Sequence, residues 1–180
     1  MKARAGHVGS QLLEMLPVLR RFALALTRSP DKADDLVQAA CERALASADR
    51  FEQGTRFDAW MFRIMRNLWI DRVRREKVAG PAVDIEESPD VPGISGEQVV
   101  EARLTLKSVS AAIEQLPDEQ REVLMLTCVD DLPYREAAAV LGVPIGTVMS
   151  RLARARRKLA EAAGITGEGA RSSDNKGERR

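Results

Sequence analysis

The chain has few of the residue types from which metal sites and disulfide frameworks are built. Its 180 residues include one histidine, His7, and two cysteines, Cys41 and Cys128, which lie far apart and form no CxxC pair. A structural zinc site needs about four such ligands at close spacing. We therefore expect no metal and no cofactor, and we interpret the cysteines as small buried hydrophobic residues in preference to redox groups.

Long hydrophobic runs are also missing. No apolar stretch approaches the roughly 20 residues that a membrane-spanning helix requires. The N-terminal MKARAGHVGS lacks the hydrophobic core of a signal peptide. We expect a cytoplasmic protein that does not insert into a membrane.

Aromatic residues make up only 4% of the chain, and alternating runs of Val, Thr and Tyr are scarce, whereas Ala, Leu, Arg and Glu are abundant. This composition disfavours strands and predicts an all-α fold. With 44% hydrophobic and 31% charged residues, the chain has the balance of a globular protein, long enough for one ordinary domain or two small ones.

The segment 78–100 divides the chain. It contains three prolines, three glycines and five acids, with no basic residue, which is typical of a linker. We therefore predict two small helical domains, over 10–77 and 101–163, joined by a flexible acidic linker over 78–100. The tail over 164–180 has no apolar face and is predicted to be disordered.

The stretch from Tyr134 to Lys158 predicts two short helices joined by a tight turn. Gly142 stands where a helix ends with a positive φ, and Pro144 suits entry to the next helix. In the second helix Val148 and Leu152 share an apolar face. The opposite face carries hydroxyl and guanidinium groups, at Thr147, Ser150, Arg154 and Arg157. Short hydroxyl side chains followed by long bidentate donors suit a helix in the major groove; an amphipathic surface helix with solvated arginines is the alternative.

The N-terminal domain shows three helical patterns. The first carries the stripe Leu12, Leu16, Leu19, Ala23 and Leu26 and ends at Ser29-Pro30, where serine can cap and proline can open the next helix. The second, from about Asp31 to Ala48, turns Leu36, Val37, Ala40 and Ala44 inward and Asp34, Asp35, Gln38 and Glu42 largely outward. The third has an apolar side with Phe62 and Trp69, opposite a polar side with Arg63, Arg66, Asn67, Arg74 and Lys77.

Large aromatic residues gather on or just before this third helix. Phe62 and Trp69 match its apolar stripe and are interpreted as core residues. Phe51, Phe57 and Trp60 lie beside the basic face, where aromatic rings can stack on unpaired bases. This surface is predicted to suit single-stranded DNA, although a purely structural core remains open for these rings as well.

Taken in order, the segments LVQAACERAL, FDAWMFRIMRNLWIDRVRR, an acidic linker, LPDEQREVLML and YREAAAVLGVPIGTVMSRLARARRKL resemble the extracytoplasmic-function (ECF) sigma factors of bacterial RNA polymerase. The resemblance covers about residues 10–160. It implies that the N-terminal domain, sigma region 2, binds core polymerase and the melted minus 10 element. It further implies that the C-terminal domain, sigma region 4, reads the minus 35 element of promoter DNA, and that an anti-sigma factor controls the protein.

The resemblance also implies roles for individual residues. For core polymerase these are Asp34, Asp35, Leu36, Val37 and Gln38. For the minus 10 element they are the loop Arg50 to Phe57, with Phe51 and Phe57, together with Trp60, Arg63, Arg66, Asn67, Arg74 and Arg75. For the minus 35 element they are Thr147, Met149, Ser150, Ala153, Arg154 and Arg157.

The chain departs from the family pattern at three positions. Met149 stands where family members often have a basic residue, and Ala153 where they often have a larger side chain. The promoter sequence that other members recognise therefore cannot be assumed for this chain. Pro133 replaces the usual serine or threonine cap, which leaves Asp130 or Asp131 to supply one. The acidic composition of the linker is consistent with passage through a basic channel on polymerase. It is equally consistent with a solvated spacer.

Two other functions stay open at this point. A helix-turn-helix repressor or activator is one, but no ligand or receiver domain is evident and the aromatic basic helix would be unexplained. A recombinase or transposase is the other, and it would need a serine nucleophile or metal-binding carboxylates in a folded core. The acids here lie mainly in the linker and on helix surfaces, so we expect a protein that is not an enzyme.

Overall fold

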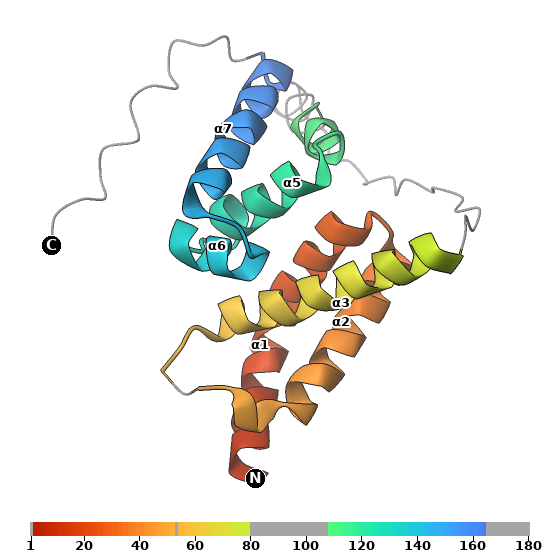
Figure 1. Ribbon diagram of the computed structural model, residues 1–180, viewed down its shortest axis with the longest axis vertical. Helices are drawn as coiled ribbons and strands as arrows, with labels where there is room; N and C mark the ends of the chain where they lie inside the picture. The colour runs from red at the N-terminus through yellow and green to blue at the C-terminus, as the bar shows by residue number, and fades with distance from the viewer. Residues whose placement is uncertain (1, 53, 80–107, 165–180) are drawn as a thin grey trace, which may run out of the picture.

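The computed structural model describes residues 2–52, 54–79 and 108–164, and within them every regular element is helical (Figure 1). The expected all-α fold with two helical domains is therefore confirmed. The predicted linker, apart from its first two residues, and the predicted tail, apart from Gly164, lie outside the described residues. In chain order the elements are α1 (Lys2–Thr27), α2 (Pro30–Ala46), the short 3-10 helix η1 (Ala48–Arg50), α3 (Phe57–Ala79), a helix over 108–114, α5 (Asp118–Leu124), the π-helical turn η2 (Met125–Val129), α6 (Tyr134–Leu141) and α7 (Ile145–Ala162).

Helices α1, α2 and α3 form the first body. Their apolar stripes meet in a core where the rings of Phe22 and Phe62 pack edge to face, with centroids 4.9 Å apart. As predicted, Ser29 caps α2: its Oγ accepts a hydrogen bond from the backbone N of Lys32, and Pro30 occupies the first turn. Leu16 is 37% exposed although the rest of its stripe is buried, because a stripe at helical spacing is wider than the face that α2 and α3 cover.

The second body consists of the helix over 108–114 and α5 to α7. Val148 and Leu152 of α7 are buried, and α7 packs against α5 and α6. Gly142 ends α6 in the left-handed region, with φ 63° and ψ 35°, as its position in the sequence predicted. Glycine tolerates this conformation because it has no Cβ.

The predicted replacement cap of α6 is wrong. Pro133 occupies the cap position without a side-chain hydrogen bond. Asp130 instead pairs with Arg21 of α1, and no hydrogen bond to the α6 N-terminus is recorded for Asp131, whose φ is 55°. Helix α6 relies on the proline, whose fixed φ and missing N–H suit a helix start.

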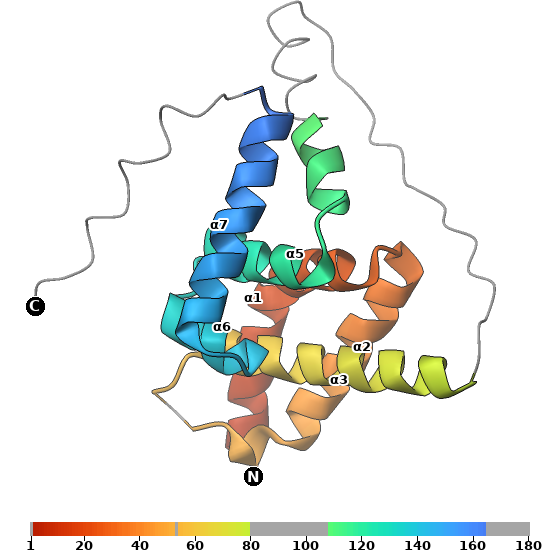
Figure 2. The ribbon, with the colours of Figure 1, turned by 45° about the horizontal axis from the view of Figure 1, so that its top comes forward.

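The two bodies touch. Helix α5 lies against α1, and α6 against α3 (Figures 1 and 2). Buried apolar residues of both bodies form one continuous cluster. Residues that are 56 to 109 positions apart in the sequence are therefore held side by side.

No single helix among the described residues is long and apolar enough to cross a membrane. Helices α6 and α7 taken together meet the length and composition criteria, but they are bent by 102° at the turn between them.

Candidate nucleic-acid and partner interfaces

Helix α7 sorts its basic residues into two groups. Arg151 is mostly buried and pairs with Glu119 of α5 at 2.7 Å, and Arg156 donates to Cys128 Sγ at 3.6 Å. These two side chains fix α7 against its own body. Arg154, Arg156, Arg157 and Lys158 are exposed, so four of the five basic residues that the sequence places on this helix face solvent, and of these four Arg156 also contacts Cys128.

The exposed face of α7 carries most of the predicted minus 35 residues. Met149 is 54% exposed, and Ser150, Ala153, Arg154 and Arg157 are also exposed. Thr147 is half-buried in the first turn. Arg157 lies 4.0 Å from Glu161, with both side chains about 70% exposed; such a pair contributes little. Within the described residues no ion pair or hydrogen bond engages the Arg154 side chain, which leaves its guanidinium available to a ligand.

The polar face of α3 is open along most of its length. Arg63, Asn67, Arg74 and Arg75 are exposed, and Arg75 Nε donates to the backbone oxygen of Asp71. Arg66 differs, because its side chain is 19% exposed and pairs with Glu122 of α5 at 3.1 Å. One predicted strand-binding residue is thus occupied by the second body.

The aromatic residues before α3 form a cluster of their own. Ring centroids lie 5.3 Å apart for Phe51 and Phe57, 5.1 Å for Phe51 and Trp60, and 5.7 Å for Phe57 and Trp60. Phe51 and Phe57 are buried, whereas Trp60 is half-buried. In this conformation Phe51 packs against Phe57 and Trp60 at the start of α3, and of the three rings Trp60 is the least buried.

Helix α2 presents the predicted polymerase-binding residues unevenly. Asp34, Asp35 and Gln38 are exposed, Val37 is half-buried and Leu36 is a core residue. Arg20 binds Asp34 through two hydrogen bonds, at 2.7 and 3.2 Å; these bonds and the guanidinium charge hold the pKa of the Asp34 carboxyl below its ordinary value. Leu36 therefore supports the helix from inside, and a partner would meet Asp34, Asp35 and Gln38.

Cys41 is half-buried, and burial raises the pKa of its thiol. Cys128 is exposed, which contradicts the expectation that both cysteines are buried. The π-helical turn η2 accounts for the difference, because its extra residue shifts the face that Cys128 would occupy on a regular helix. Among the described residues no group of three or more His, Cys, Asp or Glu side chains could hold a metal ion.

Comparison with known proteins places these surfaces in a family. The model of sigma-70 region 2 matches residues 12–78, and that of sigma-70 region 4 matches residues 106–159. The ECF RNA polymerase sigma factor EcfG of Rhodopseudomonas palustris is 38% identical over 148 residues, which cover 82% of this chain and 80% of that protein. This chain is an ECF sigma factor.

Other ECF sigma factors agree with this assignment. SigW of Bacillus subtilis is 32% identical over 137 residues, covering 71% of this chain and 73% of SigW. Among solved structures, the sigma factor RpoE of Bartonella quintana in complex with the anti-sigma factor NepR matches with a TM-score of 0.73 and 36% identity, over 88% of this chain and 98% of RpoE. CnrH in complex with the cytosolic domain of CnrY matches with a TM-score of 0.63 and 27% identity, over 92% of this chain and 96% of that chain.

Within this ECF sigma factor, the first body corresponds to sigma region 2 and the second to sigma region 4. Sequence reasoning missed the residues that join them: Arg21, Arg28, Asp118, Arg121, Glu122 and Asp130. One of these could have been found, because Arg121 precedes buried Leu124 and Met125 by three and four residues and so lies on an apolar stripe. The others are charged residues of the kind expected on a helix surface, and no feature of the neighbouring sequence identifies their partners.

Proposed function

We propose that this ECF sigma factor binds core RNA polymerase in the cytoplasm and sets where transcription starts. Region 2, over 10–77, would hold the melted minus 10 strand, and region 4, over 101–163, would read the minus 35 duplex, with the segment over 78–100 as their tether. The task requires recognition and strand capture, while the chemistry of RNA synthesis belongs to polymerase.

The observation that carries the proposal is the sorting of basic residues on α7. Arg151 pairs with Glu119 and Arg156 contacts Cys128 of the same body, whereas the exposed Arg154, Arg157 and Lys158 stand beside Ser150 and Met149. Helix α6 and the left-handed turn at Gly142 present this face as the second helix of a helix-turn-helix, the geometry that enters a major groove. Arg154 and Ser150 would then meet base edges, and Arg157 the phosphates.

Region 2 supplies the complementary surface for a single strand. Arg63, Asn67, Arg74 and Arg75 are exposed along α3, and Trp60 stands half-exposed at the end of this row. Guanidinium groups that follow a backbone and a ring on which a base can stack are the parts of a single-strand site. Phe51 and Phe57 would shape the loop that receives a flipped base.

An anti-sigma factor would control this protein. Support comes from the solved relatives, in which RpoE is bound to NepR and CnrH to the cytosolic domain of CnrY. Such a partner would compete with polymerase for surfaces of both regions.

Binding to core polymerase can be tested through Asp35, which is exposed on α2. Its Oδ2 lies 3.8 Å from Nη1 of Arg72. We expect Asp35→Lys to weaken binding to core polymerase by about tenfold or more, because an acidic contact becomes a like-charge repulsion. The measurement is equilibrium binding of the labelled sigma factor to purified core enzyme.

Glu14→Lys is the matched control. Glu14 is exposed on α1, so the same change of charge is placed on region 2 outside the proposed interface, and binding should stay at the wild-type level. Equal affinities for the Asp35 and Glu14 variants would remove α2 from the interface.

A further inference from the structure

Helix α7 leaves a row of apolar side chains exposed near its N-terminus. Ile145 and Met149 are 47% and 54% exposed, and Ala153 is exposed one turn later. Because residues four apart lie on the same side of a helix, these three form one continuous surface, the apolar stripe of α7. Single exposed apolar residues are normal on a protein, whereas adjoining ones mark a candidate binding surface.

Gly146 gives a ligand close access to this stripe. It is exposed and lies one turn before Met149 and Ser150. A Cβ added to Gly146 would meet no packing neighbour within 4 Å. Glycine inside a helix lowers stability relative to alanine, and packing among the described residues does not require it here. The missing side chain lets a ligand approach the helix backbone directly beside Met149.

The surroundings of the stripe suit an anionic partner. Residues 145–160 include five basic residues and no acid, a composition that attracts the phosphates of DNA. Ser150 and Arg154, which adjoin the stripe on the exposed side of α7, belong to the proposed minus 35 surface. Base edges are contacted mainly by the N-terminal residues of such a helix. The stripe is therefore continuous with the surface proposed to read DNA.

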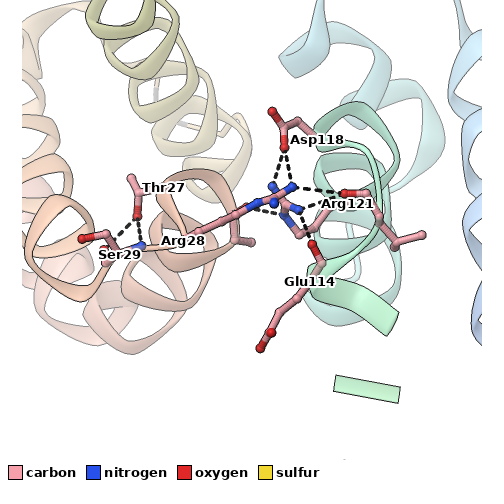
Figure 3. Close-up of polar contacts among 8 residues, drawn as sticks. Thr27, Arg28, Ser29, Glu114, Asp118 and Arg121 are labelled. Atoms are coloured by element: carbon pink, nitrogen blue, oxygen red, sulfur yellow. Dashed lines mark hydrogen bonds and ion pairs between the residues drawn. The ribbon is translucent and has the colours of Figure 1, made fainter. Parts of the chain in front are cut away.

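Contacts with region 2 are made elsewhere on region 4. Arg28, just after α1, donates to Leu116 O and to Asp118, and Arg121 of α5 also donates to Asp118 (Figure 3). This network engages the start of α5, whereas the stripe lies on α7 and stays about half-exposed in the presence of region 2. The stripe therefore remains accessible to DNA while the two regions are in contact.

The chemistry of the stripe matches one feature of the major groove. Isoleucine has no hydrogen-bonding group in its side chain, and the thioether of methionine is only a weak acceptor. Placed against the nitrogen and oxygen atoms of a base edge, such side chains would leave polar groups unpaired, which is costly. The 5-methyl group of thymine is the apolar group that base pairs present in this groove.

We propose that Met149, flanked by Ile145 and Ala153, packs on a thymine methyl group of the minus 35 element and so sets the base preference there. This inference rests on the proposed function, which places α7 in the major groove, and it adds the chemical group that is read. Lysine at this position would favour guanine O6 and N7. Methionine in place of a basic residue therefore changes which base is preferred.

Deoxyuridine provides the test, because it pairs as thymine does but lacks the 5-methyl group. The probe is a promoter duplex with the minus 35 sequence that the full-length chain, bound to core polymerase, selects from a random library. Each thymine of the element, on either strand, is replaced singly. At one thymine we expect the wild type to bind about fourfold more weakly, the effect of losing one buried methyl group.

Met149→Ala should abolish this loss, so that the variant binds the thymine and deoxyuridine duplexes equally. Met149→Lys should lose the preference for thymine at the same position. Both changes are made at an exposed residue, so neither threatens the core. Val129→Ala is the matched control: Val129 is 44% exposed on η2 of the same body, outside α7. This variant also loses an exposed apolar side chain, yet it should keep the wild-type response to deoxyuridine.

Equal wild-type binding of thymine and deoxyuridine duplexes at every position would overturn the inference. So would a selected element without thymine in either strand, or a response to deoxyuridine that Met149→Ala retains. If Met149→Ala weakens binding to core polymerase and keeps the thymine preference, the stripe contacts polymerase and not DNA. Failure of the proposed function looks different, because the chain with core polymerase would then select no minus 35 sequence, and both proposals would fall.

Discussion

Phe62→Ala should lower the free energy of unfolding of region 2 by about 3–5 kcal/mol, the range for large-to-small changes at buried aromatic residues. Phe62 is completely buried where α3 crosses α1, and its ring packs edge to face on Phe22. Truncation removes both this contact and the apolar burial, and the cavity cannot collapse easily between helices that also pack on α2. Chemical denaturation followed by circular dichroism measures the change.

Leu13→Ala is the comparison for that experiment. Leu13 is a large apolar residue on α1 that is 71% exposed, so its truncation should cost no more than about 0.5 kcal/mol. If both variants lose the same stability, the core does not lie where α1, α2 and α3 meet. A full loss of folding by Phe62→Ala also agrees with the account, because a small domain is only marginally stable.

Arg154→Ala should weaken promoter recognition by about 1–3 kcal/mol, or roughly 5- to 150-fold, while binding to core polymerase stays intact. Arg154 is exposed on α7, and within the described residues nothing else engages its guanidinium. A lost base-edge contact should also relax the choice of base at one position of the minus 35 element. In vitro transcription from a library of promoters varied in that element measures both effects.

Arg156→Ala controls for loss of charge on the same helix. Arg156 turns back to Cys128 Sγ of its own body, so its removal should leave the preferred minus 35 sequence unchanged. If Arg156→Ala relaxes the base preference and Arg154→Ala does not, the proposed groove-facing side of α7 is wrong.

Local features of the fold were readable from the sequence because their causes are local. Ser29 and Pro30 open α2, and Gly142 closes α6 in the left-handed region, each through backbone chemistry within a few residues. The apolar stripe of α3 correctly placed Phe62 in the core. Such signals do not depend on which other segment packs nearby.

Features that depend on distant segments were not readable in this way. Leu16 has the spacing of a core residue, yet the neighbouring helices leave it exposed. Asp130 looked like a helix cap and instead reaches Arg21, more than 100 residues earlier in the chain. Likewise, Arg66 appeared as one of a uniform basic row, and only the position of α5 distinguishes it from Arg63. The sequence around an exposed charged residue does not identify its partner. The ion pairs between the two regions could therefore be found only in the structure.

We propose that this chain directs core polymerase to a defined set of promoters. The most direct measurement is start-site mapping after in vitro transcription of genomic DNA by purified core polymerase, with and without the chain. We expect a distinct subset of start sites, sharing minus 35 and minus 10 elements, to appear only when the chain is present. Identical start sites in both reactions, with active core enzyme and folded protein, would contradict the account.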